Sequence, residues 1–211
     1  MNSRLLLHCG WASALYYAAI TALVPLQWAE YRSRTQTISE ISAIGAPTRT
    51  LWLVLAAVYT VLTLLFAWGL LRAAAQRPSL RFAGLFLLIF GLLGLVWPLA
   101  PMHLRETIAT GGGTLTDKVH IGLGLVSVLL MLAAVALTAS AFGGMFRVFS
   151  WGSVLLIVLF GALTGKEAPG ISSNSPTPWI GLWERASLGI FLLWVAVLSG
   201  QVLRGTEGSS R

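Results

Sequence analysis

Charged residues are scarce in this chain, and their scarcity excludes an ordinary soluble domain. Asp, Glu, Lys and Arg make up 10% of the 211 residues, whereas apolar residues make up 56%; soluble domains average about 25% charged residues. Cysteine is nearly absent as well. Because Cys9 is the only one, the chain can form no internal disulfide and no multi-thiolate metal site. Long polar segments are also missing, so no part of the chain could bury a separate soluble core.

Long apolar runs fill most of the sequence. Six of them are close to the roughly 20 residues that an α-helix needs to cross a ~30 Å hydrocarbon core. They cover residues 5–26, 51–71, 82–99, 119–141, 146–163 and 179–203. We therefore expect one all-α domain over residues 1–211, a polytopic bundle of six transmembrane helices. The first run is too long for a signal peptide and lacks a convincing small-residue cleavage site at its end, so it should remain as the first helix.

Basic residues outnumber acidic ones by 14 to 7, and their distribution predicts the orientation. If both termini are cytoplasmic, the inner segments carry a net charge of +6 and the outer segments +1. The inner segments contain one acid, Glu207, and seven basic residues: Arg4, Arg72, Arg77, Arg81, Arg147, Arg204 and Arg211. The outer segments contain six acids and seven basic residues: Arg32, Arg34, Arg49, Arg105, Lys118, Lys166 and Arg185. This is the positive-inside pattern. It predicts a multi-pass protein of the cell (inner) membrane, with the lipid bilayer as its partner, and argues against nucleic acid.

With this orientation the three longer connections, residues 27–50, 100–118 and 164–178, lie outside, where function is expected. The first contains "TISEISAIGAP", residues 37–47, in which Glu40 stands between Ser39 and Ser42. The Gly and Pro that follow suit a turn, so we expect the segment to fold over the outer mouth of the bundle. Ser39 or Ser42 should bond nearby backbone there. Glu40 should reach Arg185 first, because a guanidinium matches a carboxylate bidentately, and a histidine second.

The other outer segments also carry polar residues. In "WPLAPMH", residues 97–103, two prolines end a helix just before His103. In "GGGTLTDKVH", residues 111–120, a threonine can cap the next helix, Asp117 lies in its first turn, and His120 follows. Glu184 and Arg185 lie inside the last apolar run, where an ionised group must face protein or water.

Together these residues form a candidate polar site at the outer face: Glu40, Ser39, Ser42, His103, Asp117, His120, Glu184 and Arg185. Three interpretations remain open. His103, His120 and Glu40 could bind a divalent metal, the only cofactor suggested, in a membrane hydrolase acting on a lipid. Arg105, Lys118 and Arg185 could instead hold the head group of a lipid or a small ligand. The cluster could also be structural, satisfying itself, with Asp117 acting only as a helix cap. No catalytic residue and no oligomeric state follow from the sequence.

Four stretches, "SEISAIGAP", "PMHLRETIATGGGTLTDKVH", "FGALTG" and "PTPWIGLWER", together resemble the membrane family catalogued as domain of unknown function 998. The resemblance covers nearly the whole chain. It implies a multi-helix bacterial membrane protein without an established activity. The matching positions of interest are Glu40, Gly45, Pro47, His103, Asp117, His120, Glu184 and Arg185. The chain departs from the pattern at "TGKEAP", residues 164–169, where an Asp-type acid is expected before Ala-Pro.

Overall fold

The structure is a computed structural model that describes residues 3–74 and 77–208, with side-chain surroundings up to residue 205. Within this part of the chain all regular structure is helical, and six helices are long and apolar enough to cross a membrane. They are α1 (Ser3–Leu23, continued by η1, Val24–Gln27), α2 (Arg49–Ala73), α3 (Pro78–Val96, continued by η3, Trp97–Leu99), α5 (Leu115–Ala141), α6 (Gly144–Glu167, followed by α7, Pro169–Ser172) and α8 (Ile180–Gly208). The prediction of six helices able to span a membrane is confirmed for the described residues.

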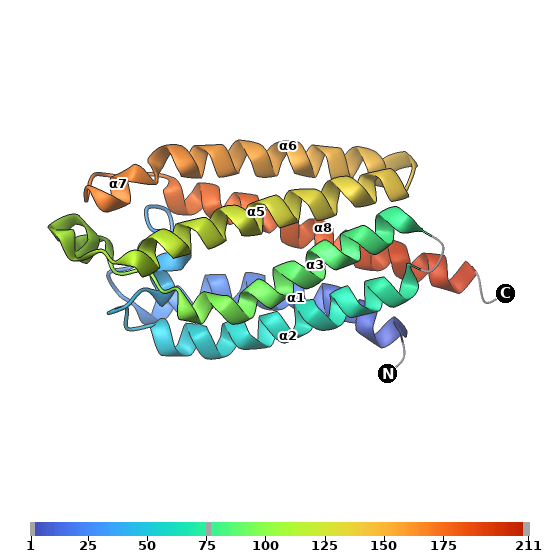
Figure 1. Ribbon diagram of the computed structural model, residues 1–211, viewed down its shortest axis with the longest axis horizontal. Helices are drawn as coiled ribbons and strands as arrows, with labels where there is room; N and C mark the ends of the chain where they lie inside the picture. Colours follow the sequence, from blue (N-terminus) through green and yellow to red (C-terminus); the bar gives the residue numbers. More distant parts are fainter. Residues whose placement is uncertain (1–2, 75–76, 209–211) are drawn as a thin grey trace.

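The six helices form a closed ring. Each packs against two others, in the order α1, α2, α3, α5, α6, α8 and back to α1. Figure 1 shows both ends of the chain and the two short connections, α2–α3 and α5–α6, at one end of the bundle. We call this the terminal end. The three long connections, residues 28–48, 100–114 and 168–179, lie at the opposite end, which we call the loop end.

Large side chains from all six helices fill the ring toward the terminal end. Phe66, Phe191 and Trp194 are among the largest fully buried residues there. The indole nitrogen of Trp194 donates to Ser150 Oγ at 3.2 Å, so this polar group is satisfied inside the core. Small residues let the helix backbones approach, as a Cβ on Gly69 would lie 2.6 Å from that of Leu6. Many large apolar side chains of the helices, such as Leu15, Val54 and Leu155, are exposed on the outside of the ring, as lipid contact requires.

Short elements close the loop end. They are η2 (Ser39–Ser42), α4 (Arg105–Thr107) and η4 (Ile108–Gly112), the last a π-helical turn. The first two long connections are joined where the Ile44 amide donates to the Met102 carbonyl oxygen at 2.7 Å. Gly45 has φ of +96°, in the left-handed region that favours glycine, so the expected turn after Glu40 is present. We call this assembly of connections the loop cap.

Candidate functional site

Glu40 is the most deeply buried charged side chain of the loop cap, with 1% of its surface exposed. Its partner is Arg105 on α4. The guanidinium donates from Nε to Oε1 at 2.7 Å and from Nη2 to Oε2 at 2.8 Å. Oε2 also accepts from the amide and the hydroxyl of Thr37, at 2.7 and 3.0 Å. Both carboxylate oxygens are therefore satisfied, in the bidentate geometry that gives the strongest ion pairs.

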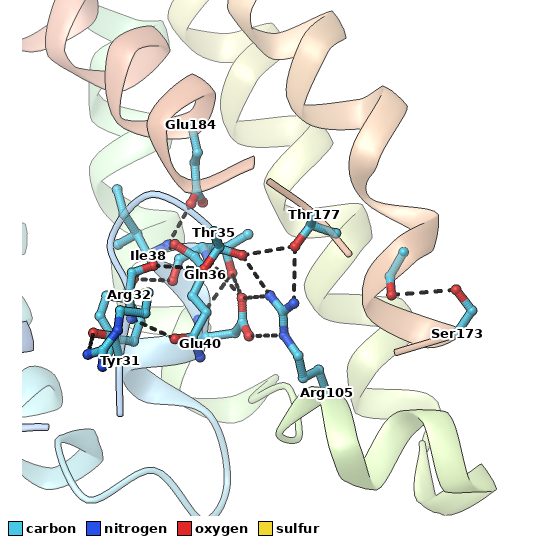
Figure 2. A network of polar contacts seen from close by, with 12 residues as sticks. Tyr31, Arg32, Thr35, Gln36, Ile38, Glu40, Arg105, Ser173, Thr177 and Glu184 are labelled. Atoms are coloured by element: carbon cyan, nitrogen blue, oxygen red, sulfur yellow. Dashed lines mark hydrogen bonds and ion pairs between the residues drawn. The ribbon is translucent and has the colours of Figure 1, made fainter. Parts of the chain in front are cut away.

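Arg105 holds the three long connections of the loop cap together through hydrogen bonds. Besides Glu40, it donates to the Thr35 carbonyl oxygen at 3.1 Å and to Thr177 Oγ1 at 3.0 Å. Thr177 in turn donates to the same Thr35 oxygen at 2.8 Å. Figure 2 shows the guanidinium lying between Glu40 and Thr177. The hydrogen bonds from Glu40 raise the pKa of Arg105 above its ordinary value, because they stabilise the charged form.

Arg185 on α8 binds a different part of the first connection. Its Nη1 donates to the carbonyl oxygens of Ser33, Gln36 and Gly181, at 2.8 to 3.0 Å. Its Nη2 donates to the Tyr31 hydroxyl at 2.6 Å, and that hydroxyl donates to Thr37 O at 2.6 Å. Burial raises the pKa of Tyr31, which keeps the hydroxyl neutral and able to donate. Carbonyl dipoles thus compensate the positive charge of the Arg185 guanidinium.

The first turn of α8 fixes the same connection through its backbone. The amide of Gly181 donates to the Arg34 carbonyl oxygen at 3.0 Å, and Glu184 Oε2 accepts from the Ile38 amide at 2.5 Å. The chain crosses the helix so closely that a Cβ at Gly181 would overlap with the carbonyl oxygens of Gln36 and Ser33. Only glycine fits at this crossing.

His103 and Asp117 form a second polar group. The His103 amide donates to Asp117 Oδ1 at 2.7 Å, and its ring Nδ1 lies 2.9 Å from Oδ2. Asp117 Oδ2 also accepts from the Thr114 amide at 2.7 Å, and the two residues form a capping box at the start of α5. The carboxylate therefore caps the helix and orients the imidazole at the same time.

His120 lies one turn further along α5 and is 8% exposed. Its Nδ1 is 2.8 Å from the Ala100 carbonyl oxygen, and its ring meets Trp97 edge-on with centroids 4.6 Å apart. Because a carbonyl oxygen can only accept, Nδ1 must carry the proton in a neutral ring. Nε2 is then an acceptor, buried and without a hydrogen-bond partner among the described residues.

Comparison with known families decides what this chain is. The model of the family described as "Protein of unknown function (DUF998)" matches residues 11–200, which includes every residue of the candidate site. The chain belongs to the DUF998 family. No curated protein and no solved structure matches it significantly. The family membership confirms the resemblance seen in the sequence and supports a transmembrane protein; it assigns no activity.

The structure corrects the ion pair expected for Glu40 in this DUF998 chain. Glu40 was expected to pair with Arg185; instead Glu40 pairs with Arg105, and Arg185 binds backbone carbonyl oxygens and the Tyr31 hydroxyl. The reason is the path of residues 31–37, which lies directly over Arg185 and offers it carbonyl oxygens. Of the two serines, Ser42 bonds backbone as expected, donating to Ser39 O at 3.1 Å.

The geometry does not support a metal centre at His103, His120 and Glu40. No three His, Cys, Asp or Glu side chains within residues 3–74 and 77–205 are grouped so that they could hold a metal ion. Glu40 is committed to Arg105, His103 to Asp117, and His120 to a backbone carbonyl.

Sequence reasoning missed the structural role of Arg105 and Thr177. Arg105 stood out as a charged residue of the second connection, but only as a ligand for an anionic head group. Glu40 precedes Arg105 by 65 residues in the sequence, and Thr177 follows it by 72 residues. No local pattern signals either contact.

Proposed function

We propose that this chain is an integral protein of the cell (inner) membrane, with both termini cytoplasmic and the loop cap on the outer side. The placement of charge supports this orientation. Six of the seven acids belong to the loop end, whereas the basic residues of the terminal end are opposed in sequence by Glu207 alone. Positive charge is retained on the cytoplasmic side of membrane proteins.

Reporter fusions test the orientation. A fusion at Arg81, at the start of α3, should report the cytoplasm, and a fusion at Gly112, in the loop cap, should report the outer side, because the net charge of the terminal end resists translocation. An alkaline phosphatase and green fluorescent protein pair measures both. The opposite pattern would place the loop cap in the cytoplasm.

For the activity, we propose that the loop end binds a lipid or small molecule through the two imidazoles. The charged side chains are poor candidates, because Glu40, Arg105 and Arg185 already have protein partners in the geometries given above. The imidazoles are different. His120 Nε2 is the observation that carries the proposal, since a buried acceptor without a partner costs about 1–3 kcal/mol.

The chemistry of the two rings defines the ligand class. His103 donates from Nδ1 to a carboxylate, and His120 from Nδ1 to a carbonyl, so a neutral ring in either place presents Nε2 as an acceptor. Asp117 and His120 lie three residues apart on one face of α5. A ligand with hydroxyl or amine donors would satisfy these nitrogens, and the Trp97 ring offers an apolar surface beside the His120 ring.

Mass spectrometry of molecules extracted from the purified protein tests this proposal. Asparagine can replace Nδ1–H of each ring but has no atom at Nε2, so His103→Asn and His120→Asn should keep the fold. We expect the amount of co-purifying molecule in each variant to be lower than in the wild type by a factor of about five or more, as loss of one buried hydrogen bond implies. His8→Asn is the matched control, since His8 is exposed and belongs to the terminal end. Equal retention by all three variants would contradict binding at the imidazoles.

A purely structural role is the second candidate, and the saturation of the charged groups favours it. Under this alternative the loop cap serves only to close the ring. The asparagine variants would then change no bound molecule, whereas variants that break contacts of the loop cap, such as those of Glu40 or Arg105, would have a phenotype.

A further inference from the structure

A cavity lies at the terminal end, opposite the loop cap. It has a volume of about 330 Å³ and is lined by Trp68, Leu71 and Arg72 of α2 and by Arg81 of α3. This volume is within the range of about 300–1,000 Å³ that is typical of small-ligand sites. The lining combines two guanidinium groups with an indole and an aliphatic side chain. Such a combination fits an amphipathic anion.

The electrostatics of the terminal end favour an anion in this cavity. Its described basic residues are Arg4, Arg72, Arg77, Arg81, Arg147 and Arg204, while the six acids other than Glu207 belong to the loop end. The described part of this end therefore carries net positive charge. Arginine binds phosphate oxygens through a planar fork of N–H donors, often two at a time.

The start of α3 adds to the positive potential of the cavity. Pro78 is the first residue of this 19-residue helix, its N-cap makes no side-chain hydrogen bond, and Arg81 lies in the first turn. Unpaired amides at a helix N-terminus carry the positive end of the helix dipole and favour anions. The helix terminus thus adds positive potential near the two arginines that line the cavity.

The surroundings indicate that the anion belongs to a lipid. Trp68 is 52% exposed and Phe82, next to Arg81, is 55% exposed, although both are large apolar residues. Tryptophan concentrates at the depth where head groups meet acyl chains. Arginines beside exposed aromatic residues at the end of a transmembrane helix therefore match a molecule with a phosphate head and an apolar tail.

We propose that this cavity binds the phosphate head group of an anionic phospholipid, held by Arg72 and Arg81, with Trp68 and Leu71 contacting the adjacent apolar part. The site lies at the other end of the ring from the imidazoles and does not depend on the function proposed for them. In the orientation proposed above this end is cytoplasmic, and basic sites on that side of transmembrane helices are suited to such lipids.

Native mass spectrometry of the full chain in detergent, titrated with phosphatidylglycerol or phosphatidylcholine, tests the site. The wild type should bind phosphatidylglycerol more tightly than the zwitterionic lipid. Arg72→Gln and Arg81→Gln should each weaken that binding about tenfold, the effect of losing hydrogen bonds to a charged group. Arg204→Gln is the matched control, because it removes the same charge from the same end, outside the cavity lining; it should weaken binding less than about twofold.

Three results would overturn this site. Equal weakening by Arg204→Gln would show that the lipid responds only to the general positive charge of this end. Equal affinity for both lipids would show that the site does not select an anionic head group. Saturation of the site by inorganic phosphate, with no preference for phosphatidylglycerol, would assign a soluble anion instead of a lipid. The lipid affinities of Arg72→Gln and Arg81→Gln are measured separately, so that if one variant fails to fold, the other still tests the site.

Discussion

Replacing Glu40 with alanine is expected to lower the free energy of unfolding by about 3–5 kcal/mol, the usual effect of removing one partner from a buried ion pair. The carboxylate is 1% exposed and the side chain of Arg105 is 12% exposed. Without Glu40, the guanidinium would keep its desolvation cost and lose two charge-assisted hydrogen bonds. The amide and hydroxyl of Thr37 would lose their acceptor as well. Unfolding in mixed micelles with increasing denaturing detergent measures the change.

Glu106→Ala is the control for that experiment. Glu106 is the next residue on α4, has the same charge, and is exposed. Its removal should change the free energy of unfolding by less than about 1 kcal/mol, as expected for a surface charge. If Glu40→Ala and Glu106→Ala were equally mild, Glu40 would not be part of a buried pair.

The Gly181→Ala variant should lose at least about 3 kcal/mol of stability, because overpacking and broken hydrogen bonds act together. The new methyl group would overlap with the carbonyl oxygens of Gln36 and Ser33, which are backbone atoms and cannot rotate away. Those two oxygens are also acceptors for Arg185. Displacing them would separate the first connection from α8.

Gly189→Ala provides the comparison within the same helix. Apart from its chain neighbours and the backbone of its own helix, no atom lies within 4 Å of a Cβ built at Gly189. Alanine favours a helix interior over glycine by about 1 kcal/mol, so this variant should be neutral or slightly more stable. Thermal unfolding of the two variants in one detergent compares them directly. A small and similar effect at both glycines would show that residues 33–36 do not cross α8 closely.

The sequence predicted the helices well because their signal is local. Each apolar run is long enough to identify a spanning helix by itself, and the cap formed by Thr114 and Asp117 depends on residues three positions apart. The turn at Gly45 was predictable for the same reason.

The partners within the loop cap could not be predicted in this way. Whether Glu40 meets Arg105 or Arg185 depends on how three separate connections are placed over the ring, and bidentate geometry alone suits either arginine. The position of residues 31–37 over α8 decides the matter, since it gives Arg185 carbonyl oxygens to bind and leaves Arg105 for the carboxylate. That path follows from the close crossing at Gly181, which sequence spacing does not reveal.

A double-mutant cycle on Glu40 and Arg105 tests most directly whether one buried ion pair holds the three connections of the loop cap together. The free energies of unfolding of Glu40→Ala, Arg105→Ala and the double variant are compared with the wild type. We predict a coupling energy of at least about 2 kcal/mol, within the range of about 0.5–3 kcal/mol found for residues in contact, so that the double variant is much less destabilised than the sum of the single ones. Additivity within about 0.5 kcal/mol would contradict the ion pair and the account of the loop cap built on it.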